Sequence, residues 1–420
     1  MDRRSRRIAL FTDSFYPELG GIQDSIAATA QALGQRGYVV RIFAPAACPA
    51  DYAVANLPVG EIDLGRNVSI HRLRSLPVPG PTRQSRLVIP HGWRWRDVAA
   101  FSADLIHTQT FFGAGWEALR AARRLRLPLV GTNHWVIGEF GNYVPLPTRT
   151  FARASVGLVT WYYDHCSMVT APSRTVLQEM QDRGLRSAHC VVSNPIDTDT
   201  FHPVTAEEKL RLKTTLGFAT PTIVYAGRLA VEKNIDILVR ALALLRQDFP
   251  TAMLVLAGHG TDQQRLERSA EEHNVAQHVR FLGTLDKASL ADVFRAADVF
   301  AIASTSESQS MTLLQAMSCG LPAVGARWRA LPEYITSASG LLATPGEPAD
   351  FARQLVTILS QPMLQQTMCL HAHRAARRFS VATVVDAWED IYARTIRAYR
   401  HGSPQTGLGN RAEETSSSWN

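Results

Sequence analysis

The chain has 420 residues, 46% of them hydrophobic, and a formal net charge of +7. This length exceeds one ordinary domain and is enough for two full hydrophobic cores. No window approaches a run of about eighteen apolar residues. The absence of such a run excludes a membrane-spanning helix. The five cysteines lack the paired spacing of a zinc site, which excludes a zinc module.

Short β-branched runs alternate with amphipathic helical stretches along nearly the whole chain, which is typical of βα units around parallel sheets. The first run, Ile8 to Phe11, follows the basic segment MDRRSRR; it is too short for a secretory signal and predicts a strand. Further strands of the first half are expected at 39–43, 68–73, 105–107, 129–132, 168–171 and 190–193. Those of the second half are expected at 222–226, 253–258, 279–282, 299–303, 323–325 and 340–343.

The alternation restarts after Phe201-His202-Pro203, where a polar stretch intervenes. We therefore expect an N-terminal Rossmann-like domain over 1–201 and a second Rossmann-like domain over 202–379. Residues 380–401 predict a long helix that can pack back on the N-terminal domain. Residues 402–420 contain little apolar surface and predict a disordered tail.

A candidate diphosphate site follows the strand expected at 222–226. Gly227 lets the backbone turn tightly, and Arg228 and Lys233 would place two cations beside the N-terminal amides of the next helix. The alternative is a pair of ordinary surface cations in a βα loop.

A second candidate segment, STSESQSMTLLQAMSCGLPAVG, begins at Ser304. The hydroxyls of Ser310 and Thr312 and the amides of Ser310 and Met311 could face phosphates. Glu307 and Gln315 are separated by up to about 12 Å if the segment is helical, which could span from a donor sugar to a ribose. Alternatively, Glu307 caps the helix and Gln315 is a solvated helix residue.

Several segments together resemble glycosyltransferase family 4, whose members are retaining enzymes with the GT-B fold. The matching segments are FTDSFYPELGGI at 11–22, GTNHW at 131–135, APSRTVLQEM at 171–180, SNPIDTDTF at 193–201, GRLAVEKN at 227–234, VRFLGTL at 279–285 and ADVFAIASTSESQSMTLLQAMSCGLPAV at 297–324. The resemblance implies an α/β protein with two Rossmann-like domains whose parallel sheets face each other across a cleft. The N-terminal domain would bind the acceptor and the second domain the nucleotide sugar.

The resemblance also implies roles for individual residues. The catalytic residues would be His134, Glu307, Arg228 and Lys233. The donor-binding residues would be Gly20, Gly21, Gly227, Arg228, Lys233, Leu282, Thr284, Glu307, Ser310, Met311, Thr312 and Gln315. In two places the chain departs from the family: Gln315 replaces the second acid, which grips the ribose, and Ser310 replaces a glycine next to the phosphates. A glutamine can still accept and donate hydrogen bonds there.

These roles imply a hexosyltransferase of class EC 2.4, which transfers a hexose from a donor such as UDP-glucose or GDP-mannose with retention. The acceptor hydroxyl would attack from the face that the diphosphate leaves, and domain closure would assemble the site. We expect no metal or other cofactor. The pair Asp197 and Asp199 matches an aspartate-X-aspartate metal signature, but the family places this segment in the link that leaves the N-terminal domain.

The acceptor is expected to be a membrane lipid such as diacylglycerol. Residues 1–200 carry 22 Lys and Arg against 16 Asp and Glu, whereas the rest of the chain carries 22 against 21. Two segments, 116–127 and 72–96, mix arginine with tryptophan and leucine, which suits an anionic membrane surface. The segment NHWVIGEFGNYVPLP and Trp161-Tyr162-Tyr163 resemble bacterial diacylglycerol glycosyltransferases.

The expected protein is cytoplasmic and peripheral at the inner face of the cell membrane, with no nucleic-acid partner. Two alternatives stay open: a glycosyltransferase with a soluble or polysaccharide acceptor, and a non-catalytic sugar-nucleotide-binding paralogue. Ordinary solvated helix faces would also account for each basic segment.

Overall fold

The computed structural model of the protein describes residues 6–78, 84–135 and 157–402. The chain divides into two compact units, Met1–Pro195 with Ala382–Asn420, and Ile196–Val381. The division falls before Phe201, because the Phe201 side chain is buried in the core of the second unit and Ile196 pairs with Ser380. The tail expected over 402–420 lies, apart from Gly402, outside the described residues.

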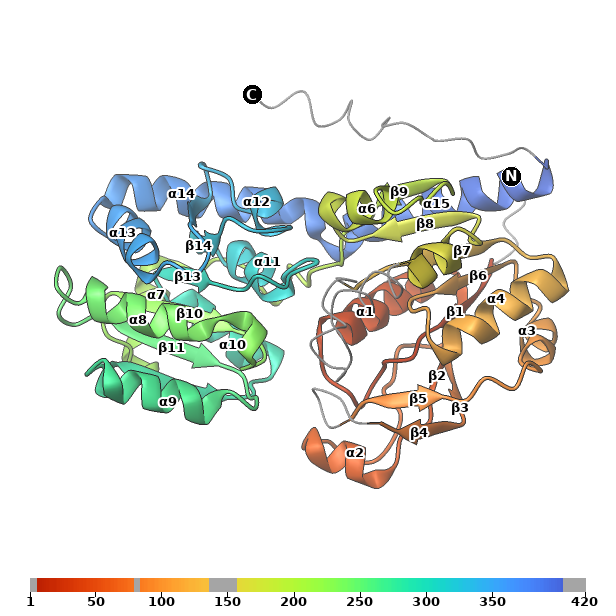
Figure 1. Ribbon diagram of the computed structural model, residues 1–420, viewed down its shortest axis with the longest axis horizontal. Helices are drawn as coiled ribbons and strands as arrows, with labels where there is room; N and C mark the ends of the chain where they lie inside the picture. The colour runs from red at the N-terminus through yellow and green to blue at the C-terminus, as the bar shows by residue number, and fades with distance from the viewer. Residues whose placement is uncertain (1–5, 79–83, 136–156, 403–420) are drawn as a thin grey trace. The chain divides into compact units, whose positions relative to one another are not determined.

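The first unit is built on a parallel sheet with the order β3-β2-β1-β6-β7-β8-β9 in the described chain (Figure 1). Its strands are β1 (Arg7–Phe11), β2 (Val39–Pro45), β3 (Val68–Leu73), β6 (Leu105–Thr108), β7 (Leu129–Thr132), β8 (Met168–Ala171) and β9 (His189–Val191). Every strand expected in the first half is present. The central strands β6, β7 and β8 are buried along their whole length, as expected for a parallel sheet covered on both faces.

Helices cover both faces of this sheet. Ile106 packs in the cluster that includes α3 (Trp95–Phe101) and α4 (Gly113–Leu125). The next residue on β6, His107, bonds Tyr392 of α15 (Val381–Arg400). Because successive strand residues point to opposite faces, α15 lies on the face opposite α4.

Helix α1 (Gly21–Gln35) joins α15 through Arg36, whose guanidinium contacts Asp386 at 2.5 Å and Glu389 at 2.6 Å. The C-terminal helix therefore belongs to the first unit. The described part of this unit also contains α2 (Pro49–Val54), α6 (Arg174–Gln181), a helical stretch at 157–163, and the short antiparallel pair β4 (Ser75–Pro77) and β5 (Arg86–Val88), which was not expected.

The second unit has a parallel sheet in the order β12-β11-β10-β13-β14-β15. Its strands are β10 (Thr222–Ala226), β11 (Met253–Ala257), β12 (Val279–Gly283), β13 (Val299–Ile302), β14 (Ala323–Ala326) and β15 (Gly340–Ala343), again at the expected places. Its helices are α7 (Ala206–Leu216), η2 (Val231–Lys233), α8 (Ile235–Leu245), α9 (Gln263–Glu272), η3 (Ala276–His278), α10 (Lys287–Ala296), α11 (Met311–Ser318), α12 (Leu331–Tyr334), α13 (Pro348–Leu359), α14 (Pro362–Ala376) and η4 (Arg377–Phe379). This order is that of a doubly wound dinucleotide-binding sheet.

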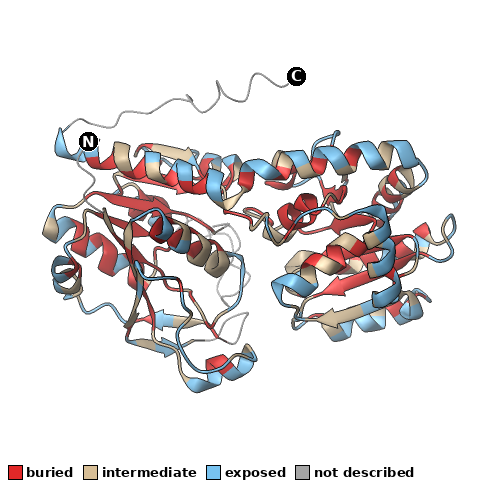
Figure 2. Ribbon diagram, turned by 180° about the vertical axis from the view of Figure 1, so that it is seen from behind, coloured by how far each residue is buried: buried red, intermediate tan, exposed pale blue. Residues whose placement is uncertain are grey.

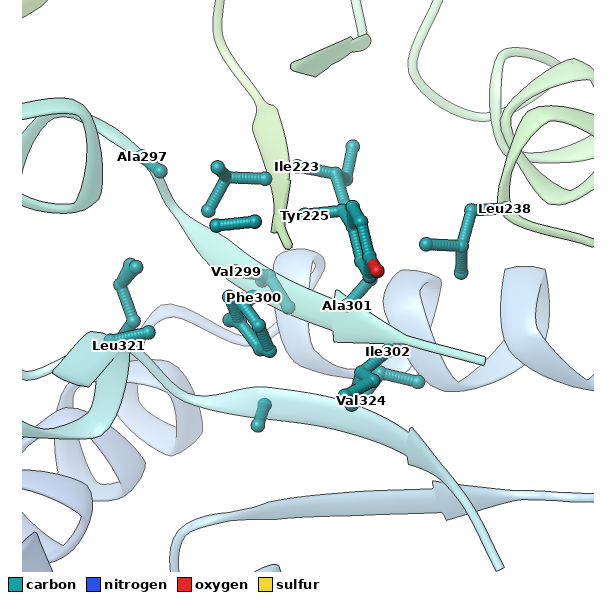
Figure 3. Packing of buried hydrophobic residues seen from close by; sticks show 14 of the residues in the cluster. Ile223, Tyr225, Leu238, Ala297, Val299, Phe300, Ala301, Ile302, Leu321 and Val324 are labelled. Atoms are coloured by element: carbon teal, nitrogen blue, oxygen red, sulfur yellow. The ribbon is translucent and has the colours of Figure 1, made fainter. Parts of the chain in front are cut away.

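The core of the second unit is centred on β10 and β13. Figure 3 shows Ile223 and Tyr225 of β10 beside β13, with Leu238 of α8 on one side and Val324 of β14 on the other. Strands of both sheets are largely buried (Figure 2). Burying each aliphatic side chain of these strands contributes about 1.5 to 3 kcal/mol to the free energy of folding. This burial holds the strands, and therefore the loops at their ends, in place. No helix in the described ranges is long and apolar enough to cross a bilayer.

Candidate active site

The two motifs expected to hold the donor meet at one end of the second sheet. Its strand order reverses between β10 and β13, and ligands of doubly wound proteins bind beyond the carboxyl ends of the strands at such a point. Lys233 follows β10 and Glu307 follows β13, and Lys233 Nζ lies 2.7 Å from Glu307 Oε1. Their side chains are 16% and 12% exposed, so this ion pair is mostly shielded from water.

Arg228 lies on the same loop as Lys233 and is also paired. Its guanidinium contacts Glu232 Oε1 at 2.6 Å, with the arginine side chain 32% exposed. The hydroxyl of Tyr225 donates to the Arg228 carbonyl oxygen at 3.2 Å and so anchors the backbone of the loop. Both cations of the expected diphosphate site therefore have a carboxylate partner within their own unit. Glu232 was not singled out from the sequence, although its position four residues after Arg228 is a recognisable helical spacing.

Glycines let the loops beyond β10 and β11 approach each other. Gly227 has φ +144°, which a side chain would strain, and a Cβ atom on Gly258 would lie 1.9 Å from the Gly227 oxygen. A Cβ on Gly260 would lie 2.0 Å from the Leu229 oxygen. Only glycine fits at these close approaches. The pair Gly258 and Gly260 was missed, and its signal is the sequence GHG directly after a buried strand.

Asn234 holds the loop of Lys233 against the loop of Glu307. It adopts a left-handed backbone conformation with φ +50°, and its side-chain amide donates to Thr305 Oγ1 at 3.0 Å. Asparagine tolerates this conformation better than most residues. Sequence reasoning missed this role, because Thr305 becomes its neighbour only once β10 and β13 pair.

The start of α11 shows which residue caps this helix. Ser310 is the N-cap and its hydroxyl accepts the Leu313 N–H at 3.2 Å, so the alternative that Glu307 caps this helix is wrong. The Thr312 hydroxyl donates to the Ala226 oxygen at 2.8 Å. Both hydroxyls thus bond within the unit. The amides of Ser310 and Met311 stand at the helix start, where backbone N–H groups are suited to an anion.

The remaining donor-site candidates of this unit are Gln315, Leu282 and Thr284. Gln315 is 7% exposed, so it is not a solvated helix residue, and within the described chain its side chain has no hydrogen-bond partner. Leu282 packs partly buried against the core on the edge strand β12, and Thr284 beyond it is exposed. Leu282 and Thr284 are separated from β10 by β11.

In the first unit, Gly20 and Gly21 form the exposed N-terminus of α1, directly beyond β1. His134 follows β7 and is buried, with Nε2 2.6 Å from Gln109 Oε1. Burial lowers the pKa of His134 to about 4, so its imidazole is neutral near pH 7. Gln109 was not singled out from the sequence.

His107 on β6 has both ring nitrogens engaged inside the first unit. Its Nδ1 lies 2.8 Å from the Tyr392 hydroxyl and its Nε2 lies 2.7 Å from Thr132 Oγ1. Burial, with a smaller contribution from His134, lowers the pKa of His107 to about 3.

Asp13 is a buried carboxylate that the sequence interpretation missed. It accepts from the Thr110 hydroxyl at 2.6 Å and from the Ala114 amide at the start of α4 at 2.8 Å. Burial raises its pKa. A small pocket beside it is lined by Asp13, Phe15, Tyr16, Pro17, Glu18, Pro45, Ala47, Asp51, Gln84 and Arg86. This mixture of rings and charged groups at the ends of β1 and β2 could hold a hydroxyl-bearing group.

Asp197 and Asp199, the pair that matches a metal-binding signature, form a local turn. The Asp197 carboxylate accepts from the amides of Asp199 and Thr200 and, at 2.7 Å, from the Thr200 hydroxyl. Burial alone would raise the pKa of Asp197, but these bonds hold it below the usual value. The residues with described positions contain no group of three or more side chains that could hold a metal ion.

The sequence matches two family descriptions that together cover most of the chain: "Glycosyltransferase Family 4" over residues 19–200 and "Glycosyl transferases group 1" over residues 207–378. A D-inositol 3-phosphate glycosyltransferase of Xylanimonas cellulosilytica is 30% identical over 310 residues, which are 70% of this chain and 72% of the relative. The chain belongs to glycosyltransferase family 4. This confirms the resemblance and the expected enzyme class, a hexosyltransferase.

Two further similarities bear on this glycosyltransferase. An alpha-monoglucosyldiacylglycerol synthase of Streptococcus pneumoniae is 27% identical over 324 residues, 76% of this chain and 70% of that protein. The structure of the Anabaena protein HepE in complex with UDP and glucose matches with a TM-score of 0.71 at 21% identity, over 93% of this chain and 100% of the other. The architecture is therefore GT-B, as expected. At 21% identity, this structural match bears on the fold alone.

Proposed function

We propose that this enzyme is a retaining glycosyltransferase that moves a hexose from a nucleotide sugar, such as UDP-glucose or GDP-mannose, to the hydroxyl of a membrane lipid such as diacylglycerol. The contact between Lys233 and Glu307, beside Arg228, carries the proposal. It joins a cation suited to a diphosphate with a carboxylate suited to sugar hydroxyls at the point where doubly wound sheets bind ligands. The relatives named above support a nucleotide-sugar donor and a diacylglycerol acceptor.

In the proposed reaction, the bond between the anomeric carbon and the phosphate oxygen breaks as the acceptor oxygen bonds to the same face of the sugar. Arg228 and Lys233 stabilise the negative charge that develops on the leaving diphosphate. The leaving phosphate oxygen takes the acceptor proton, so no protein nucleophile is needed. Glu307 orients the sugar, and His134 hydrogen-bonds it. Gly20 and Gly21 offer backbone amides to the donor phosphates, and Gln315 takes the place of the ribose-binding acid.

The lipid acceptor is supported by one surface of the first unit. Helix α4 exposes Trp116, Arg120, Arg123 and Arg124, which recur at helical spacing and form one stripe. Trp116 is 39% exposed, and its ring lies 5.8 Å from that of Trp161, which is 46% exposed. Tryptophan rings beside arginines combine shallow insertion with attraction to anionic headgroups.

The basic segment 72–96 contributes less free charge to a membrane than its sequence implies. Arg72 pairs with Glu61, and Arg86 pairs with Asp51. The Arg96 guanidinium lies 4.4 Å from the Trp93 ring centroid, and Trp93 is exposed. Arg83 and the acceptor-like segment 136–147 lie outside the described residues. We therefore assign membrane binding mainly to α4 and the neighbouring Trp161.

A panel of labelled nucleotide sugars with vesicles of mixed anionic lipid and diacylglycerol tests the proposal. We expect one donor to give a glycolipid whose anomeric configuration, read by NMR, matches that of the donor. Inversion, or efficient transfer to a soluble sugar with none to lipid, would contradict it. Donor binding without any turnover would favour a non-catalytic protein.

Changing Arg120, Arg123, Arg124 and Arg126 together to Gln tests the surface. At about 1 kcal/mol for each engaged arginine, vesicle binding should weaken more than tenfold at low salt, and transfer to lipid should fall more than donor hydrolysis. The matched control changes four exposed cations of the second unit, Arg240, Arg268, Lys287 and Arg353, to Gln. Equal losses in both variants would show a net-charge effect and remove α4 from the proposal.

A further inference from the structure

A continuous group of buried polar side chains runs through the first unit to His134. It begins at Tyr392 on α15, passes through His107 on β6, and reaches Gln109 just beyond that strand. Gln109 then contacts His134 at 2.6 Å. All four residues are buried, so water does not replace these contacts.

The backbone holds Gln109 and His134 rigidly. The backbone N–H of Gln109 donates to the backbone oxygen of Phe11 on β1 at 2.8 Å, which fixes Gln109 beside this strand. The residue before His134, Asn133, donates its amide to the Thr170 oxygen on β8 at 2.8 Å. The short side-chain contact between Gln109 and His134 therefore joins two anchored segments.

The surroundings of Gln109 determine which end of its amide faces His134. The amide nitrogen lies 3.2 and 3.4 Å from the two ring nitrogens of His107. That imidazole stays neutral, with its pKa lowered to about 3 by burial, so one of its ring nitrogens keeps a lone pair that can accept the Gln109 side-chain N–H. With the amide nitrogen turned toward His107, the carbonyl oxygen is the end that faces His134, and it can only accept a hydrogen bond.

We propose that Gln109 is a positioning residue that fixes His134 as the Nε2–H tautomer and leaves Nδ1 as a hydrogen-bond acceptor for a sugar hydroxyl. The inference rests on the proposed role of His134 at the transferred sugar. Nδ1 is buried and has no hydrogen-bond partner in the part of the chain with described positions. A buried acceptor of this kind is left unsatisfied until a donor group such as a hydroxyl reaches it. Fixing the tautomer beforehand spares a rearrangement during transfer.

The first test reads the tautomer without depending on activity. Protein labelled with ¹⁵N-histidine is examined by two-bond ¹H–¹⁵N NMR at pH 8, and the His134 signals are those missing from a His134→Gln spectrum. We expect a pure Nε2–H pattern in the wild type and a mixture of tautomers in Gln109→Leu. An Nδ1–H pattern in the wild type, or an unchanged pattern in Gln109→Leu, would overturn the proposal even if the enzyme's donor were unknown.

The second test measures transfer. We expect Gln109→Leu to lower kcat at least tenfold while the donor KM changes less than threefold. Gln109→Glu keeps an acceptor oxygen, so at pH 8 it should retain the tautomer and recover most of kcat. The control is Gln178→Leu, an exposed glutamine of the same unit whose side-chain amide donates to Asp182. Full kcat in Gln109→Leu despite mixed tautomers would overturn the positioning role and leave the proposed glycosyl transfer intact.

Discussion

Changing Lys233 to Met is the sharpest test of the donor site. The variant keeps the length of the side chain and removes the charge whose Nζ lies 2.7 Å from Glu307 Oε1. Two effects should follow and can be measured separately. One is the loss of a contact to the leaving diphosphate, and the other is the loss of a partner for Glu307.

The catalytic effect should exceed the effect on stability. A hydrogen bond to a charged group contributes about 1.5 to 3 kcal/mol, which corresponds to a loss of about 10-fold to 150-fold in kcat/KM. The ion pair is mostly but not fully shielded from water, at 16% and 12% exposure, so the stability cost of breaking it lies between those of surface and buried pairs, about 1 to 2 kcal/mol. That cost would lower the melting temperature by a few degrees.

A double-mutant cycle with Glu307→Gln separates the two effects. Because Lys233 and Glu307 contact each other, the double variant should lose less stability than the two single variants lose together. Transfer should stay impaired in all three variants. Lys287→Met, an exposed lysine of the same unit, is the matched control. Transfer by Lys233→Met within threefold of the wild type, in a folded protein, would refute the reasoning.

Three further outcomes follow from the structure. Activity should survive EDTA, since in the proposed reaction Arg228 and Lys233 neutralise the diphosphate; complete loss that manganese restores would instead indicate a metal site. Gly258→Ala should destabilise the second unit by about 2 kcal/mol or more in urea unfolding, because its Cβ would lie 1.9 Å from the Gly227 oxygen, whereas Gly184→Ala, with open space, should cost less. Below about pH 6.5, His107 and His134 take up protons in the unfolded chain but stay neutral in the folded one, so the free energy of unfolding should fall by about 2 kcal/mol for each histidine by pH 5. His107→Gln should make the unfolding free energy depend less steeply on pH between 7 and 5, and an unchanged dependence would contradict this reasoning.

The sequence predicted the parallel sheets well because their strands are short apolar runs between turns. Strands such as β10 and β13 are buried along their whole length and need no knowledge of their neighbours to be recognised. The pair β4 and β5 was missed because each has three residues and no sustained alternation. Phe201 was placed before the domain boundary because a sequence does not show which core receives a side chain.

The sequence allowed site candidates to be named within motifs, but not the partners that the structure gives them. Arg228, Lys233 and Glu307 stand in recognisable segments. Their neighbours depend on strand pairing: Asn234 and Thr305 are 71 residues apart and meet only because β10 and β13 are adjacent. Gln109 is 25 residues from His134 and reaches it across the sheet. Such partners carry no local signal, because the polar residue types that form them are equally common on exposed loops.

The charges of the donor site have a consequence for binding. Arg228 and Lys233 each already hold a carboxylate, so a diphosphate does not enter a site of bare positive charge. In the function that we propose, binding would instead be an exchange, in which phosphate oxygens replace or join Glu232 and Glu307. The same event that engages Lys233 would release Glu307 toward the sugar, and so would link phosphate recognition to sugar orientation in the proposed reaction. A free sugar lacks the phosphates needed for this exchange, and should therefore bind the site far more weakly than the nucleotide sugar.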